Sequence, residues 1–156
     1  MKNENRTSGT CQICGANHKA KHGLIAHHGY RRPYEGMQTS SCYGARSLPY
    51  EVSCNAIPGY IERLERCLEN NEVRLIDLMK NPPMELTYFR LGDSKKVVRP
   101  EGFDADKCID AYTFSAMSSR YEITFQNLIK SIKRDIQNIP KDIEYFKARI
   151  ANWRES

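Results

Sequence analysis

The stretch that decides the fold is CQICGANHKAKHGLIAHHGY, residues 11–30, with Cys42 as the next cysteine along the chain. Two thiolates separated by two residues, here Cys11 and Cys14, can hold one tetrahedral metal ion. Gly15 permits the backbone turn that aims amides at their sulfurs. Because histidines and a further cysteine follow, the sequence predicts one structural Zn²⁺ site near the N-terminus.

Four ligands close such a site, and this segment offers more than four candidates. The preferred ligand set is Cys11, Cys14, His28 and Cys42. Adjacent residues of a strand point to opposite faces, so only one histidine of the His27-His28 pair reaches the metal. We prefer His28, which shares a face with Leu24 and Ala26, and keep His27 as the alternative. A set with Cys54 in place of the histidine is the main rival.

The other cysteines and the N-terminus bear on the compartment. The start, MKNENRTSGT, has no apolar run and predicts no secretory signal, and no later stretch approaches the length of a membrane span. We therefore expect a cytoplasmic protein that does not enter a membrane and whose thiols are reduced. Cys67 and Cys108 lie in helix-like surroundings and are interpreted as small buried apolar residues.

The net charge of +5 is concentrated at one end of the chain. Residues 1–50 hold seven Lys/Arg against two Glu, whereas residues 51–156 hold 17 basic and 17 acidic residues. A positive field attracts polyanions, so the cysteine-bearing third is predicted to contact nucleic acid. The residues predicted to make these contacts are Lys19, Lys21, Arg31, Arg32, Arg46 and Tyr34. The alternative interpretation is that the charge serves solubility and the tyrosines pack over the metal.

The chain is predicted to contain two structured regions after a flexible N-terminus at residues 1–10. Residues 11–56 are rich in turn formers and need a metal to supply the missing stability. Residues 57–156 form a helical coiled-coil region with a connector at about residues 81–103. The fold class is therefore α+β, mainly α: a small zinc-knuckle, ribbon-like module on a helix-hairpin scaffold.

Local patterns add one helix and two hairpins. A helix is predicted over residues 59–80, where apolar residues recur at helical spacing before Asn81-Pro82-Pro83. Two short hairpins are predicted, one pairing residues 19–21 with 24–28 around His22-Gly23 and one pairing residues 85–90 with 96–99 around Gly92-Asp93. His18 and His22 belong to the first hairpin and are expected to be exposed.

From Asp104 the chain is predicted to be helical to its end. Its last part repeats apolar residues at steps that alternate four and three: Phe125, Ile129, Ile132, Ile136, Ile139, Ile143, Phe146, Ile150 and Trp153. This repeat is typical of a coiled coil. Pro140 removes one backbone hydrogen bond, and because the repeat continues in phase across it we expect a kink rather than a break.

The length of the same apolar repeat predicts that the protein binds a partner. The helix at 59–80 has a looser version of it, so an antiparallel pairing within one chain is expected, with part of the longer C-terminal stripe left exposed. That surplus predicts a homodimer or a partner protein. The residues predicted to bind it are Ile132, Ile136, Ile139, Ile143, Phe146, Ile150 and Trp153.

Several short strings together resemble a group of small zinc-finger-like proteins encoded by bacteriophages and prophages. They are CQICG at residues 11–15, HHGYRRP at 27–33, SCYGA at 41–45 and PYEVS at 49–53, with a helical tail ending in Ala-Arg-Ile-x-x-Trp. The resemblance covers about residues 11–54 and implies a ligand set that uses a histidine rather than Cys54. It also implies the cytoplasm of a host bacterium, with host or defence complexes as partners, but no particular activity.

These observations favour a non-enzymatic, zinc-stabilised interaction protein that binds nucleic acid through its basic module. The first alternative is a protein-binding module or inhibitor that acts on a host or defence complex through its coiled coil. The second is a metal-dependent nuclease, which needs an open coordination position and a general base. Glu35 and Glu51 are the nearby carboxylates, and neither has a recognisable spacing to the histidines.

Overall fold

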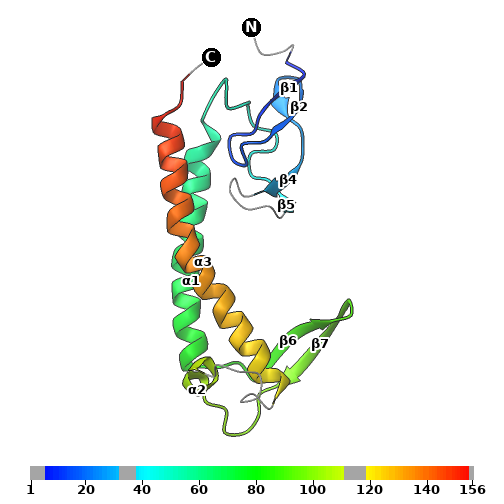
Figure 1. Cartoon of the computed structure of the whole chain (residues 1–156), viewed down its shortest axis with the longest axis vertical. Helices are drawn as coiled ribbons and strands as arrows, with labels where there is room; N and C mark the ends of the chain where they lie inside the picture. The colour runs from blue at the N-terminus through cyan, green and yellow to red at the C-terminus, as the bar shows by residue number, and fades with distance from the viewer. Residues whose placement is uncertain (1–5, 32–37, 111–118, 155–156) are drawn as a thin grey trace. The chain divides into compact units, whose positions relative to one another are not determined.

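The computed structural model describes residues 6–31, 38–110 and 119–154. Its elements, in chain order, are β1 (Ser8–Thr10), β2 (Asn17–Lys21), β3 (Leu24–Ile25), β4 (Gly29–Arg31), β5 (Gln38–Ser41), α1 (Ala56–Lys80), β6 (Glu85–Arg90), β7 (Asp93–Val98), α2 (Ala105–Asp110) and α3 (Arg120–Ala151) (Figure 1). The fold class is therefore α+β with mainly helix, as the sequence predicts.

Contacts between residues divide the chain into two units. The terminal unit joins Met1–Arg66 to Lys141–Ser156, and the middle unit comprises Cys67–Pro140. This division differs from the predicted boundary near residue 56, because the first turns of α1 and the last turns of α3 pack with the N-terminal strands. Both long helices therefore contribute to both units.

The strands of the terminal unit form two small antiparallel sheets. One has the order β1-β2-β3, and β4 pairs with β5 to form the other. β2 and β3 pair through Lys21 and Leu24 around the two-residue turn at His22-Gly23, which confirms the predicted hairpin. Both turn residues have positive φ (52° and 77°), as a type I′ turn requires.

β1 departs from expectation, because residues 1–10 are predicted to be flexible. Ser8–Thr10 instead pair with β2 in an antiparallel ladder. The Thr10 amide also donates to both carboxylate oxygens of Glu51, at 3.1 Å each. Two sets of hydrogen bonds therefore fix this strand, whereas residues 1–5 lie outside the described part of the chain.

Gln12, a fully buried polar residue, ties the first turn of the chain to the start of α1. Its Oε1 accepts a hydrogen bond from the Ala56 amide at 2.8 Å. Its Nε2 donates to the Leu48 carbonyl at 2.8 Å and to Asn55 Oδ1 at 3.1 Å. Since the first amides of a helix lack partners within the helix, Gln12 acts as the cap of α1.

Arg149, near the end of α3, holds the same turn from the other side. Its Nε donates to the Gln12 carbonyl at 2.9 Å and one terminal nitrogen donates to the Cys11 carbonyl at 3.3 Å. Its guanidinium also lies 3.8 Å from the centre of the Tyr50 ring. Trp153 Nε1 in turn donates to the Tyr50 carbonyl at 2.6 Å. The last residues of the helix thus brace the N-terminal strands.

The middle unit has a separate core built on aromatic residues. Its buried residues are Ala105, Cys108, Tyr121, Phe125 and Ile129, with Leu75, Leu78 and Met79 of α1 packed against them. Phe103 meets the rings of Tyr121 and Phe125 edge-on, at centroid distances of 4.9 and 5.1 Å. β6 and β7 pair in register from Glu85↔Val98 to Arg90↔Asp93, so a hairpin forms as predicted. Its second strand begins at Asp93 rather than residue 96, and its turn is Leu91-Gly92 rather than Gly92-Asp93.

The long helices differ in detail from their predictions. α1 begins three residues earlier than predicted, at Ala56, and α3 runs through Pro140 without interruption. The predicted helix from Asp104 onward is represented by α2 and α3, and residues 111–118 between them lie outside the described residues. Neither long helix in the described ranges carries an apolar run that could cross a bilayer.

The apolar repeat of α3 is covered by the chain itself. Its buried members are Phe125, Ile129, Ile132, Ile139, Ile143 and Phe146. Ile136, Ile150 and Trp153 are half-buried. The expected surplus of exposed seam is therefore not observed. Leu75, Leu78 and Met79 of α1 pack on the cluster of Phe125 and Ile129, and the Tyr60 ring meets Phe146 edge-on. A coiled-coil hairpin and a homodimer stay predictions.

Candidate metal centre

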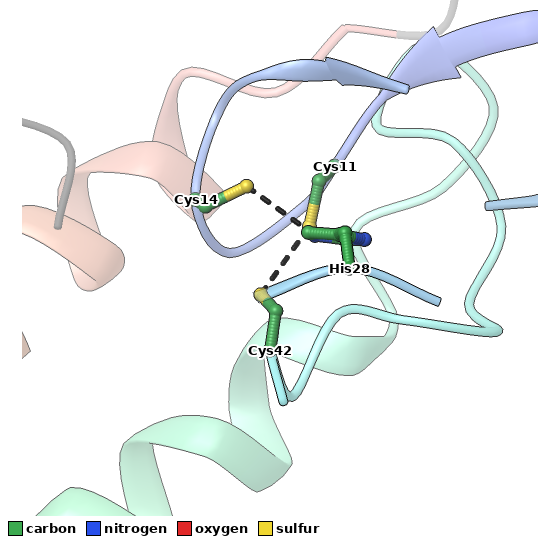
Figure 2. A group of neighbouring side chains, drawn as sticks. All are labelled: Cys11, Cys14, His28 and Cys42. Atoms are coloured by element: carbon green, nitrogen blue, oxygen red, sulfur yellow. Dashed lines mark hydrogen bonds between the residues drawn. The ribbon is translucent and has the colours of Figure 1, made fainter. Parts of the chain in front are cut away.

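Four side chains converge on one point of the terminal unit (Figure 2). They are Cys11, Cys14, His28 and Cys42, whose ligand atoms all lie within 4.8 Å of one another. Cys11 and Cys14 occupy the turn between β1 and β2, His28 precedes β4, and Cys42 follows β5. The three cysteines are buried and His28 is half-buried. Three separate segments of chain therefore supply one cluster.

The distances within the cluster match a tetrahedral metal site on two of its edges. With metal–sulfur bonds of about 2.3 Å and metal–nitrogen bonds of about 2.0 Å, tetrahedral geometry requires S···S edges of about 3.8 Å and S···N edges of about 3.5 Å. Cys11 Sγ lies 3.8 Å from Cys42 Sγ, and Cys14 Sγ lies 3.4 Å from His28 Nε2. These two edges share no atom, so all four ligands take part in the match.

The turn that carries Cys11 and Cys14 has the hydrogen bonds of a zinc knuckle. The Ile13 amide points at Cys11 Sγ, with an N···S distance of 3.4 Å. The Gly15 amide donates to the Cys11 carbonyl at 3.1 Å, and Gly15 has a φ of 73°. Only glycine adopts this backbone conformation without strain, so the Cys-x-x-Cys-Gly string folds into the turn that brings its two sulfurs together.

A second glycine makes room for the sulfurs. A Cβ atom at Gly44 would lie 2.4 Å from Cys11 Sγ, so no other residue fits there without displacing the ligand. The Gly44 amide also hydrogen-bonds to Cys42, as the Ala16 amide does to Cys14. Amides placed two residues after each cysteine offset negative charge on the sulfur. The Cys-Tyr-Gly string is therefore the second half of the same site.

His28 is held in the orientation that a metal ligand needs. Its Nδ1 lies 2.8 Å from the Ala26 carbonyl oxygen. A carbonyl oxygen can only accept, so Nδ1 carries the proton and Nε2 presents its lone pair to the cluster. An outer hydrogen bond of this kind, which fixes the imidazole tautomer, accompanies nearly all histidine metal ligands.

His18 lies against the cluster, although it was expected to be exposed. Its ring stacks on that of His28, with centroids 3.7 Å apart and planes inclined by 20°. Its Nε2 is 3.5 Å from Cys14 Sγ. The reason is the alternation of β2, which turns His18 and Ala20 inward and Lys19 and Lys21 outward. The prediction placed His18 on this hairpin but on its exposed face, and Lys19 and Lys21 occupy that face instead.

The two rival ligands lie outside the cluster. His27 is exposed, and its Nε2 lies 2.8 Å from the hydroxyl oxygen of Ser41. Cys54 is half-buried in the turn before α1. The structure thus brings together the preferred set and neither alternative. All six cysteines have free thiols in the structure, and their reduced state in the cell stays a prediction. Cys108 is buried as expected, but Cys67 is exposed because it lies on the outer face of α1.

Crowding three thiols together has a marked effect on their acidity. Hydrogen bonding from Cys11 lowers the pKa of Cys14 far below its ordinary value. Hydrogen bonding with Cys11 and Cys14 raises the pKa of Cys42, and hydrogen bonding with Cys14 raises the pKa of Cys11. Ionisation of one of the three thiols therefore hinders ionisation of its neighbours. A divalent cation resolves the conflict, because it stabilises all three thiolates at once and releases their protons.

The residues predicted to contact nucleic acid are only partly described. Lys19 and Lys21 are exposed on β2, on the face opposite His18, and Arg46 is exposed in the turn after Cys42. The backbone of Arg31 lies in β4. Arg32 and Tyr34 lie outside the described residues.

Two residues that the sequence did not single out, Gln12 and Arg149, hold the metal-binding turn. Their hydrogen-bond partners lie far away in the sequence, so no local pattern indicates them.

No protein-family model, no curated protein and no solved structure matches this chain. The cluster is therefore interpreted from its own geometry and chemistry.

Proposed function

We propose that this protein is a non-enzymatic nucleic-acid-binding module whose N-terminal strands are stabilised by Zn²⁺ bound to Cys11, Cys14, His28 and Cys42. The observation that carries the metal assignment is the donor set, three thiolates and one oriented imidazole. Thiolate-rich tetrahedral sites select Zn²⁺, whereas Mg²⁺ and Ca²⁺ take oxygen ligands.

A structural role follows from the number of ligands. Catalytic zinc sites keep one position for water, and four protein ligands leave none. The nearest carboxylate considered as a general base, Glu51, is engaged by the Thr10 amide. These two features favour a structural over a hydrolytic role for the site, while Glu35, the other carboxylate considered as a base, lies outside the described residues.

The nucleic-acid assignment rests on exposed charge beside this site. Lys19 and Lys21 project from the same face of β2, about 7 Å apart as alternate residues of a strand. This separation is within the Debye length of about 8–10 Å at physiological salt, so their fields add. The strand that carries them is fixed by His18 against the metal cluster. Zinc thus holds a pair of cations in place for phosphate groups.

Salt dependence of binding tests the proposal. The protein is titrated against a short fluorescent oligothymidylate at several salt concentrations, and its zinc content is measured by elemental analysis. Single-stranded DNA gives a slope of log K against log salt of about −0.7 for each phosphate neutralised. Changing Lys19→Gln and Lys21→Gln together should make the slope shallower by about 1.4, since two contacts are lost.

A matched control separates this effect from net charge. Lys95 and Lys133 are exposed lysines of the middle unit, and changing both to Gln alters the net charge by the same amount. That variant should keep the wild-type slope. The proposal is contradicted if the wild-type protein does not bind at low salt, or if both double variants change the slope equally.

A further inference from the structure

A hollow of about 460 Å³ opens on the terminal unit beside the metal-binding strands. Its lining includes Leu24, Tyr43, Arg46, Ser47, Asn55 and Ala56. The volume falls within the range of about 300–1,000 Å³ typical of small-molecule sites. The mixture of apolar, aromatic, cationic and amide groups is that of a site which recognises a flat ring bearing a nearby negative charge. We infer that this hollow is the subsite for one unpaired nucleotide of the bound strand, an inference that rests on the proposed function.

The first support is an exposed aromatic ring with a rigid backing. Tyr43 is 40% exposed, and its ring packs against that of Tyr60 at a centroid distance of 5.3 Å. Gly59 of α1 leaves room for the hydroxyl, since a Cβ there would lie 2.8 Å from it. Leu24, also 40% exposed, lines the same hollow. A fixed, half-open ring with an apolar neighbour provides a stacking platform for a base.

The second support is the backbone of Arg46. This residue has a φ of 65°, a conformation that glycine adopts more readily than arginine. Two other non-glycine residues with positive φ, His22 and Leu91, lie in two-residue hairpin turns that require it. Arg46 also lies in a turn, closed by the Ser47 amide on the Gly44 carbonyl at 3.3 Å, and its own amide donates to the Ile25 carbonyl at 2.8 Å. Two backbone hydrogen bonds thus hold an exposed arginine with an unfavourable φ at the lining of the hollow, and residues held in this way cluster at binding sites.

The third support is a fixed amide group. Asn55 lines the hollow, and its Oδ1 accepts a hydrogen bond from Gln12 Nε2 at 3.1 Å. The carboxamide is therefore held at its oxygen end, and its NH₂ group is the donor for a ligand. A stacking ring, a cation for phosphate and a donor for a base edge together define a nucleotide site. Duplex DNA, whose bases are stacked inside, cannot place a base in this hollow.

The experiment compares single-stranded oligothymidylate with a duplex of equal length, using the full zinc-loaded chain. Tyr43→Leu should weaken single-strand binding about 5- to 150-fold, the range for losing one stacked base, and leave duplex binding unchanged. Tyr43→Phe keeps the ring and should bind as the wild type does. Zinc content and melting temperature are measured for each variant.

Arg46→Gly provides a second variant whose folding is not in doubt, because glycine relieves the backbone strain. It should melt no lower than wild type, yet make the salt slope for the single strand shallower by about 0.7. The nucleotide subsite is overturned if Tyr43→Leu and Arg46→Gly both bind single strands like wild type while Lys19→Gln/Lys21→Gln still weakens binding. In that case the proposed function stands. Absence of binding by the wild-type protein overturns both.

Discussion

The strands of the terminal unit and the core of the middle unit reach order in different ways. Between residues 6 and 55, the buried apolar side chains other than the three cysteine ligands are Ile13, Ile25 and Pro49 among the described residues. In the middle unit Tyr121, Phe125 and Ile129 are fully buried in one cluster. Burial of a large side chain contributes about 1.5–3 kcal/mol, so the middle unit has a core of its own and the strands do not.

The comparison shows that the metal supplies to the N-terminal strands the stability that an apolar core supplies to the middle unit. Segments below about 40 residues usually need a disulfide, a metal or a partner to fold. Here the cluster joins three segments, and Gln12 and Arg149 attach the result to the helix ends. The middle unit, with an aromatic core, needs no such link. The two units should therefore respond differently to the same perturbation.

The largest effect is expected from removing one ligand. Cys42→Ser should abolish zinc binding and unfold the N-terminal strands, because a structural zinc contributes about 10–16 kcal/mol in small zinc-finger peptides. Elemental analysis and amide hydrogen exchange measure the two outcomes. Cys67→Ser, at an exposed thiol of the middle unit, is the matched control and should change neither. Retention of stoichiometric zinc by the Cys42 variant would contradict the ligand assignment.

The next prediction, Phe125→Ala, weakens the core of the middle unit and leaves the metal site unchanged. Phe125 is fully buried and touches Phe103 edge-on, so truncation leaves a cavity and should cost about 3–5 kcal/mol. The denaturation midpoint of the middle unit should fall, while zinc content stays at one ion per chain. Loss of zinc from this variant would contradict the comparison, because it would show that the metal site depends on the core of the middle unit.

A smaller effect is expected at Arg149, which bonds to two carbonyls of the metal-binding turn. Arg149→Lys keeps the charge but loses the planar fork that donates to Gln12 and Cys11 and stacks on Tyr50. Hydrogen bonds from charged groups contribute about 1.5–3 kcal/mol each, so the terminal unit should lose stability of about this size. Thermal unfolding followed at Trp153 reports it. Equal stability of the lysine variant would mean that charge alone anchors the turn.

The smallest effect is a difference in alkylation rate between two thiols of the folded protein, Cys108 and Cys67. Burial raises the pKa of Cys108, whose Sγ donates to the Glu122 carbonyl, so little thiolate exists at neutral pH. Its alkylation should be slow and should accelerate only as pH rises past the ordinary cysteine range. Exposed Cys67 should react rapidly. Mass spectrometry after alkylation of the zinc-loaded protein measures both rates, and equal rates would contradict the described core.

Local signals made much of this molecule predictable. The knuckle string, the turn at His22-Gly23 and the spacing of α3 each depend on neighbouring residues, and each is observed. The four clustered side chains are the predicted set, although His27 and His28 lie in the irregular segment between β3 and β4 and not on a strand as assumed. Local chemistry therefore indicated the cluster.

Other features depend on contacts that are distant in sequence. The bond from Arg149 to Gln12 links residues 137 positions apart, and no spacing rule reaches that far. Part of the stripe of α3 was expected to be exposed, because the sequence does not show which surfaces cover the residues beyond the reach of α1. His18 was placed on the predicted hairpin but assigned to its exposed face, although strand alternation puts it on the face opposite Lys19 and Lys21.

Amide hydrogen exchange with and without a zinc chelator tests the central claim most directly. Once elemental analysis shows that the ion is gone, protection should disappear in β1, β2 and the turn around Cys11, while amides of α3 between residues 121 and 139 keep theirs. Unchanged protection of the strands in the metal-free protein would show that they hold their fold without the ion.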